Sequence, residues 1–117
     1  MKNKRVLGNE GERAAATYLE NIGYIVLEKN WRFKRSEIDL ICKKDDTLVF
    51  VEVKTRSYVA FGEPEAAVDQ KKAEKVMEGA EEYIFQNDWH GDIRFDIVSI
   101  LMNDGKQKVL HLQDAFY

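Results

Sequence analysis

The sequence predicts an α/β fold in which a mixed β-sheet of about five strands is flanked by helices. Two segments with apolar residues at helical spacing are each followed by shorter β-rich segments. Together they give the order α-β-β-β-α-β-β, which favours helices packed on a mixed sheet. The chain of 117 residues has the length of a single domain, and we assign residues 1–117 to it.

The first helix is predicted from about Asn9 to Asn21, followed by Gly23, a residue suited to ending a helix. Its apolar stripe consists of Ala15, Ala16, Leu19 and Ile22. Glu12 lies on the same stripe. An acid at the start of a helix suits the macrodipole, so Glu12 is either a favourable end charge or a carboxylate aimed at the sheet. Both interpretations stay open.

Three strands are predicted next, and the last two form a hairpin. A short β-rich segment, Tyr24–Glu28, precedes the hairpin arms Ser36–Lys43 and Thr47–Lys54. The turn between the arms is most simply Asp45-Asp46. The second arm contains the apolar run Leu48-Val49-Phe50-Val51, which is typical of a strand buried on both faces.

The second half of the chain supplies one helix and a second hairpin. After an irregular stretch, Thr55–Glu65, a helix is predicted from an Asp69 N-cap to about Gln86. Its core-facing stripe is Ala73, Val76, Met77, Ala80 and Ile84. Strands at Ile93–Met102 and Lys108–Gln113 then flank Asn103-Asp104-Gly105, a strong hairpin turn signal.

The composition, 44% hydrophobic and 33% charged, is that of a soluble globular protein. No signal-peptide pattern and no apolar segment of roughly 20 residues is visible, so neither secretion nor a membrane partner is expected. Cys42 is the single cysteine, which excludes an internal disulfide and favours the cytoplasm. With His90 and His111 far apart in sequence, a structural zinc site is not expected.

Charge is unevenly distributed around a net value of −3, which argues against indiscriminate nucleic-acid binding. One basic stretch has no acidic residue between positions 29 and 36 and contains Lys29, Arg32, Lys34 and Arg35. A second basic group, Lys71, Lys72 and Lys75, begins the second helix. Each is either a solvated face or a surface for phosphate groups.

The strongest chemical signal is a pair of acids across the predicted hairpin. A turn centred on Asp45-Asp46 places Asp39 directly opposite Glu52, with Cβ atoms roughly 5 Å apart. Lys54 shares their face, because strands have a period of two. Like charges directly opposite destabilise a sheet unless something neutralises them, and Mg²⁺ prefers such oxygen ligands. The pattern therefore predicts a divalent-cation site, provided that the register holds.

Asp39, then Glu52-x-Lys54 on the next strand, resembles the PD-(D/E)XK nuclease signature. More narrowly, the chain is similar to the YraN-like family, small bacterial proteins with an endonuclease-like fold related to archaeal Holliday-junction resolvases. The matching motifs span about residues 8–96 and are Gly8-x-x-Gly11-Glu12, Asn30-Trp31-Arg32, Glu37-Ile38-Asp39-Leu40-Ile41, Val49-Phe50-Val51-Glu52-Val53-Lys54-Thr55-Arg56, Phe61-Gly62-x-Pro64 and Arg94-Phe95-Asp96.

The resemblance implies a restriction-endonuclease-like three-layer core and a site with assigned roles. Asp39, Glu52 and the Val53 carbonyl would bind one or two Mg²⁺ or Mn²⁺ ions. Lys54 would orient or help deprotonate the attacking water and stabilise charge in the transition state. Glu12 would assist metal or water positioning. The nucleic-acid contacts expected on this resemblance are Arg32, Lys34, Arg35, Arg56, Lys72 and Lys75.

The sequence departs from the family pattern at two places. Ser36 stands where the pattern has glycine, which affects how the strand enters beside the site. The second helix begins Asp69-Gln70-Lys71-Lys72 in place of threonine-initiated, arginine-rich turns, which affects the details of any DNA contact. For Asp96, which matches a family position, we favour structural pairing over catalysis.

The leading functional hypothesis is a metal-dependent nuclease that hydrolyses phosphodiester bonds in DNA, with branched or recombination intermediates as candidate substrates. The alternatives are a non-cleaving nucleic-acid-binding module on the same fold, with RNA left open as a ligand, and a protein-interaction domain. Resolvase-like relatives act as dimers, so a homodimer is also considered. The Thr55–Glu65 stretch, with Tyr58 and Phe61, would supply its interface.

Overall fold

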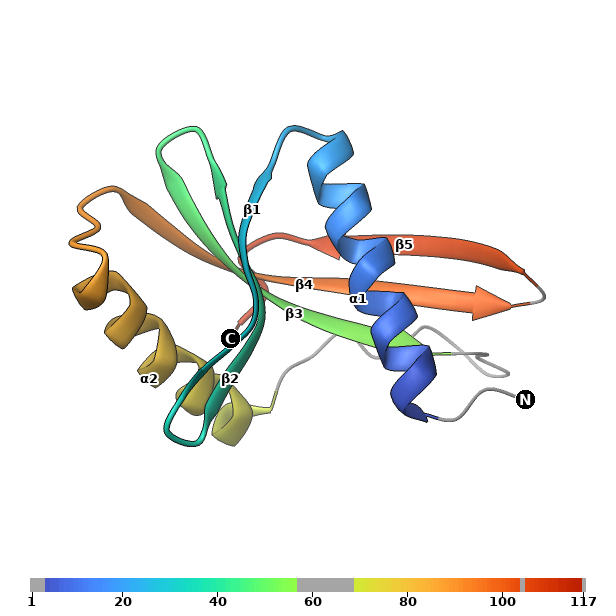
Figure 1. Cartoon of the computed structure of the whole chain (residues 1–117), viewed down its shortest axis with the longest axis horizontal. Helices are drawn as coiled ribbons and strands as arrows, with labels where there is room; N and C mark the ends of the chain where they lie inside the picture. The colour runs from blue at the N-terminus through green and yellow to red at the C-terminus, as the bar shows by residue number, and fades with distance from the viewer. Residues whose placement is uncertain (1–3, 57–68, 104, 117) are drawn as a thin grey trace.

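The computed structural model describes residues 4–56, 69–103 and 105–116. Its elements follow the predicted order (Figure 1). They are α1 (Lys4–Asn21), β1 (Ile25–Phe33), β2 (Ser36–Lys44), β3 (Thr47–Arg56), α2 (Gln70–Gln86), β4 (Asp92–Asn103) and β5 (Lys106–Leu112).

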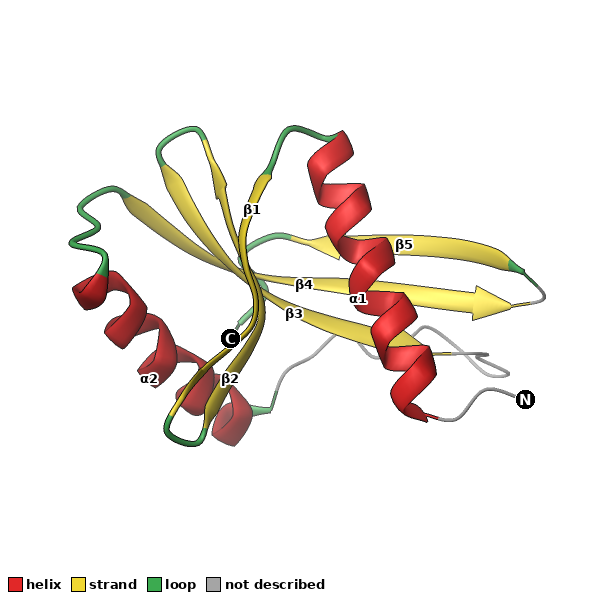
Figure 2. Ribbon diagram, viewed as in Figure 1, coloured by secondary structure: helices red, strands yellow, loops and turns green. Residues whose placement is uncertain are grey.

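The five strands form one mixed sheet in the order β1-β2-β3-β4-β5. All neighbours are antiparallel except β3 and β4, which are parallel and are connected through α2. The two helices cover different faces of this twisted sheet (Figure 2), and each face has its own hydrophobic cluster. The predicted three-layer α/β core of restriction-endonuclease type is therefore confirmed.

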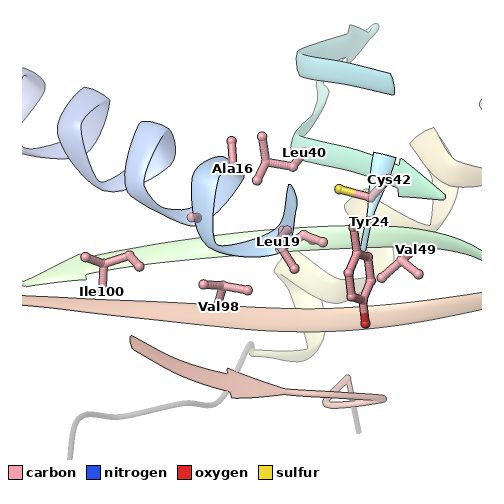
Figure 3. Packing of buried hydrophobic residues seen from close by; sticks show 10 residues of the cluster. Ala16, Leu19, Tyr24, Leu40, Cys42, Val49, Val98 and Ile100 are labelled. Atoms are coloured by element: carbon pink, nitrogen blue, oxygen red, sulfur yellow. The ribbon is translucent and has the colours of Figure 1, made fainter. Parts of the chain in front are cut away.

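The α1 side of the sheet is a continuous apolar layer (Figure 3). Ala16 and Leu19 of the helix pack there with residues from all three central strands, namely Leu40, Cys42, Val49, Val51, Val98 and Ile100. Cys42 is fully buried, and this burial, with the nearby charge of Asp96, raises the pKa of its thiol to about 12. Its role is therefore packing.

The α2 side is fixed by a capped helix start and a close contact with β2. The Asp69 carboxylate accepts the Lys72 N–H at 2.9 Å, which confirms the predicted N-cap. The Ser36 hydroxyl donates to the Lys75 carbonyl at 2.7 Å. A Cβ added to Gly79 would lie 3.0 Å from that of Ser36, so helix and strand approach closely there. Ser36, the departure from the family pattern, thus joins the start of β2 to α2.

The β2–β3 hairpin has the predicted register. Its turn lies at Asp45-Asp46, and Asp45 has a left-handed φ of 53°. The pairing runs from Lys44 opposite Thr47 to Leu40 opposite Val51. This register puts Asp39 and Glu52 at the next position along the two strands.

Several predicted boundaries were wrong, and three of them have an identifiable physical cause. The first strand reaches Phe33 instead of Glu28, because a bulge between Val26 and Glu28 shifts the alternation and Asn30 has a positive φ. Helix α1 begins at Lys4, ahead of the predicted Asn9, since two glycines weaken the local helical signal. Thr55 and Arg56 were predicted to be irregular but continue β3, because β4 pairs beside them.

The remainder of the predicted irregular stretch, including Tyr58 and Phe61, lies outside the described residues. Within the described residues, neither helix combines the length and apolarity needed to cross a bilayer.

Candidate functional site

Asp39 lies where the β2–β3 pairing ends. Beyond the Leu40–Val51 pair, the Asp39 carboxylate accepts the backbone N–H of Val53 at 2.8 Å. The Asp39 side chain thus replaces the backbone carbonyl that a neighbouring strand would supply, so the Val53 N–H has an acceptor. The same hydrogen bond fixes the Asp39 carboxylate at the point where the two strands separate.

Glu52 is the second acid of this site and is already paired. Its carboxylate lies 3.2 Å from the ammonium of Lys72, and only 11% of its side chain is exposed. Burial raises the pKa of Glu52, and the opposing charge of Lys72 only partly offsets this, so the net shift is upward. Burial lowers the pKa of Lys72, but Glu52 outweighs it and the pKa lies above its usual value.

The pKa of Asp39 is raised to about 7. Burial is the largest cause, and the charge of Glu52 is the next; the Val53 N–H opposes them, and the charge of Glu12 adds a further increase. The predicted acids from α1, β2 and β3 are therefore close enough to act on one another electrostatically. A carboxyl with a pKa near neutrality marks a position where a cation or proton is favourable.

Helix α1 reaches this region because of Gly11. A Cβ at Gly11 would overlap the side chain of Thr55, so the helix lies directly on the last part of β3. Glu12 follows within the same turn. Because α1 begins at Lys4, Glu12 is not in its first turn, and its interpretation as a favourable end charge is wrong. Its electrostatic effect on Asp39 agrees with the alternative, a carboxylate directed toward the sheet.

Lys54 and Val53 complete the predicted constellation on β3. The charge of Lys54 lowers the pKa of Glu52, so the two side chains are electrostatic neighbours. Val53 packs against the α1-side cluster. Lys72, predicted only as a phosphate contact, joins this group through its ion pair with Glu52. No local sequence signal could have revealed that pair, since twenty residues separate its members.

Asp39 and Glu52 are the side chains of this site that could bind a divalent cation. Among the described residues, no three His, Cys, Asp or Glu side chains are grouped so that they could hold a metal. Mg²⁺, however, is usually bound by one or two carboxylates together with water and substrate phosphate. Asp39 and Glu52 fit that smaller requirement, and the raised pKa of both groups shows that a positive charge would be stabilised beside them.

The predicted basic residues fall on neighbouring elements. Arg32, Lys34 and Arg35 are exposed at the β1–β2 turn, although Arg32 pairs with Glu37 at 2.8 Å. This turn lies beside the beginning of α2 (Figure 1), where Lys75 is also exposed. Arg56 lies apart from them, half-buried at the end of β3.

Asp96 has a structural environment, as favoured from sequence. It is fully buried and accepts hydrogen bonds from two guanidinium nitrogens of Arg94, from His111 and from the Asp114 N–H. Tyr18 of α1 lies 3.2 Å from the other ring nitrogen of His111. Arg94 and Asp96 are two residues apart and so share a strand face, and this spacing was a sequence signal for their ion pair. The pairing of Asp96 with His111 was not predicted.

A cavity of about 540 Å³ lies between α1 and β5, apart from the acidic group. None of the predicted site residues lines it.

Replacing Asp39 by asparagine is expected to stabilise the metal-free protein more at pH 8 than at pH 5, by on the order of 2 kcal/mol. The Asp39 pKa is about 7 when folded, against about 3.9 in an unfolded chain. Between these values the folded state retains a proton that the unfolded state has lost, so stability falls as pH rises through the window. An amide oxygen still accepts the Val53 N–H, but carries no charge.

Urea unfolding in EDTA at both pH values measures this difference. Asp45→Asn, an exposed position in the turn of the same hairpin, is the matched control and should show no comparable pH dependence. An Asp39→Asn effect of equal size at both pH values would contradict the raised pKa.

The fold and site together define an α/β protein with a restriction-endonuclease-like core and an acid pair flanked by lysines. The family model of the uncharacterised protein family UPF0102 matches residues 11–100, and the chain belongs to this family, the YraN family that its motifs resemble.

Curated relatives match over nearly their whole length. A UPF0102 protein of Syntrophomonas wolfei is 46% identical over 113 residues, which cover 96% of this chain and 98% of the relative. A UPF0102 protein of Caldanaerobacter subterraneus is 44% identical over 118 residues, with 97% of each chain covered. A UPF0102 protein of Flavobacterium psychrophilum is 41% identical over 111 residues, which cover 95% of this chain and 93% of the relative.

Proposed function

We propose that this protein is a metal-dependent nuclease that hydrolyses phosphodiester bonds in DNA. The observation that supports it best is the pair Asp39 and Glu52, two partly buried acids whose charges act on each other where the β2–β3 pairing ends. Such a pair is costly in a stable fold unless a cation compensates it. Lysines from β3 and α2 border the same acids, as a phosphate-cleaving site requires.

Each side chain has a role in this proposal. Asp39 and Glu52, with the Val53 carbonyl, would hold one or two Mg²⁺ or Mn²⁺ ions, which supply Lewis-acid chemistry and an acidified water when bound. Lys54 orients the attacking water and stabilises the negative charge that develops on the phosphate. Glu12 would assist in positioning the metal or this water.

Lys72 must exchange partners when the site is used. In the structure its ammonium lies 3.2 Å from the Glu52 carboxylate, so Lys72 would leave this carboxylate if Glu52 held a metal ion. The Asp69 cap keeps the backbone of Lys72 in the first turn of α2. Once its ammonium leaves Glu52, Lys72 is still near the N-terminus of α2, where it binds a substrate phosphate.

The basic residues and the DNA substrate also have a place in the proposed function. The basic β1–β2 turn and Lys75 contact phosphates beside the cleaved bond. Branched DNA in the cytoplasm is the proposed substrate, and a homodimer would match the two-fold character of a junction.

A non-cleaving nucleic-acid-binding module is the second candidate. It is favoured by the Lys72–Glu52 ion pair, which already compensates one of the two acids, and by the lack of a third grouped acid among residues 4–56, 69–103 and 105–116. In that case the basic side chains bind phosphates and the acids only shape the surface.

A cleavage assay separates the two candidates. Highly purified protein is incubated with single-stranded, duplex, flapped and four-way-junction DNA in Mg²⁺, in Mn²⁺ and in EDTA. We expect products from a branched substrate in either metal and none in EDTA. If no substrate is cut, while binding survives neutralisation of Asp39 and Glu52 but is lost on charge reversal of Arg32, Lys34 and Arg35, the protein is the binding module.

A further inference from the structure

An aromatic pair lies on the end of edge strand β1. The rings of Trp31 and Phe33 are nearly parallel, with an interplanar angle of 16° and centroids 6.4 Å apart. Trp31 is held from the other side by Tyr83 of α2, whose ring is perpendicular to it at 5.2 Å. Trp31 packs against the α2-side core, whereas Phe33 is not among the residues of either described core cluster. Packing thus explains Trp31, whereas Phe33 is half-buried beside the Trp31 ring and belongs to neither described cluster.

Cationic residues flank Phe33 in the sequence, and one of them, Arg32, is paired with Glu37. The Lys34 ammonium lies 5.2 Å from the centroid of the Phe33 ring. Arg32 and Arg35 are exposed on either side of these residues. The run from Trp31 to Arg35 therefore alternates aromatic and cationic residues, with half-buried rings at the end of β1 and exposed cations that continue into the turn. Aromatic rings interleaved with cations are the usual elements of single-stranded nucleic-acid binding surfaces.

This surface adjoins the acidic site. Phe33 pairs directly with Ser36, whose hydroxyl bonds to the Lys75 carbonyl of α2. Asp39 lies three residues further along β2, a distance of roughly 10 Å along a strand. Figure 1 shows the β1–β2 turn beside the first turns of α2, the helix that supplies Lys72. A DNA strand bound at the acid pair would therefore lie close to Phe33.

We infer that Phe33, backed by Trp31, stacks an unpaired base of a DNA strand whose phosphates run along the basic turn. Bases inside a duplex have both faces covered by neighbours, so only an unpaired base can use such a surface. Lys34 is exposed, and its ammonium moves from the ring to a phosphate when the base binds. The inference rests on the proposed nuclease function and specifies its substrate, DNA with a single-stranded segment next to the cleaved bond.

Tryptophan fluorescence in EDTA tests the stacking without cleavage. The chain has two tryptophans, and Trp89→Phe leaves Trp31 as the single reporter. Titration with an oligothymidylate of about 15 nucleotides should quench Trp31, and a blunt duplex of equal length should bind at least about tenfold more weakly. Phe33→Leu, which keeps apolar bulk but removes the ring, should weaken single-strand binding about tenfold, whereas Phe33→Tyr, which keeps a ring and leaves Trp31 as the single tryptophan, should bind like the parent.

Unchanged circular dichroism and melting temperature would show that the Phe33 variants fold. Equal binding by Phe33→Leu and the parent protein, or a Trp31 signal unchanged at saturation, overturns the inference. So does Phe33-dependent dimerisation without any oligonucleotide binding, which assigns the surface to a second copy of this chain. If binding depends on the Phe33 ring but no substrate is cut, the stacking surface is supported and the nuclease proposal fails. If DNA is cut equally well by the parent and Phe33→Leu, the nuclease proposal is supported and the stacking inference fails.

Discussion

Replacing Glu52 by glutamine is expected to reduce metal-dependent DNA cleavage about a thousandfold. The substitution keeps the size of the side chain but removes one of the two carboxylates proposed to hold the ion. It also releases Lys72 from its 3.2 Å ion pair, so positive charge at the site remains while the means of binding a cation is weakened. Single-turnover rates on a branched substrate measure the loss, and calorimetric titration with Mn²⁺ measures the weaker metal binding.

Glu37→Gln is the matched control for this variant. Glu37 lies on β2, its charge reaches Glu52, and it pairs with Arg32 on the surface. Its removal should change cleavage by less than about tenfold, because a surface ion pair contributes little. Wild-type cleavage by the Glu52 variant, with unaltered Mn²⁺ affinity, would place the catalytic centre elsewhere.

The acid pair could be predicted because its geometry is local. One two-residue turn at Asp45-Asp46 fixes the register of β2 and β3 as far as Leu40 opposite Val51, and Asp39 and Glu52 are the next residues on the two strands. Lys72 could be assigned to a helix start but not to a partner. Its ion pair depends on how α2 packs against the sheet, and that packing is set by contacts such as Ser36 with Lys75.

The end of β1 was missed for a related reason. A bulge after Val26 and a positive φ at Asn30 interrupt the alternation from which a strand is recognised. Pairing with β2 overrides those local signals and continues the strand to Phe33. The basic stretch could therefore be predicted from the sequence, whereas the stacking of Trp31 on Phe33 is seen only in the structure.

Replacing Asp96 by asparagine is expected to destabilise the protein by about 3–5 kcal/mol at neutral pH, because it leaves a cation without its buried partner. The Asp96 carboxylate is fully buried and receives two nitrogens of Arg94 as well as His111, whose side chain is only 6% exposed. An ionised carboxylate only accepts hydrogen bonds, whereas an amide nitrogen directed at these donors opposes them. Urea unfolding should show the loss as a lower midpoint.

The loss of stability in Asp96→Asn should depend on pH, in a direction set by the hydrogen bonds to the Asp96 carboxylate. Burial raises the pKa of Asp96, but its hydrogen bonds from His111 and Arg94 outweigh this, so the pKa lies below its usual value. The carboxylate therefore stabilises the fold above the unfolded pKa, and this contribution is lost as pH falls through the folded pKa. The difference between parent and variant should shrink in acid.

Asp88→Asn provides the comparison, since the Asp88 carboxylate makes an exposed contact with a ring nitrogen of His90 at 2.9 Å. An exposed pair contributes at most about 1 kcal/mol, so this variant should unfold near the parent midpoint. If Asp96→Asn were equally mild, Arg94 and His111 would have to be satisfied without the carboxylate. Because the same network reaches Tyr18 of α1, a large Asp96 effect would also mean that the helix bearing Glu12 is held to the sheet partly through it.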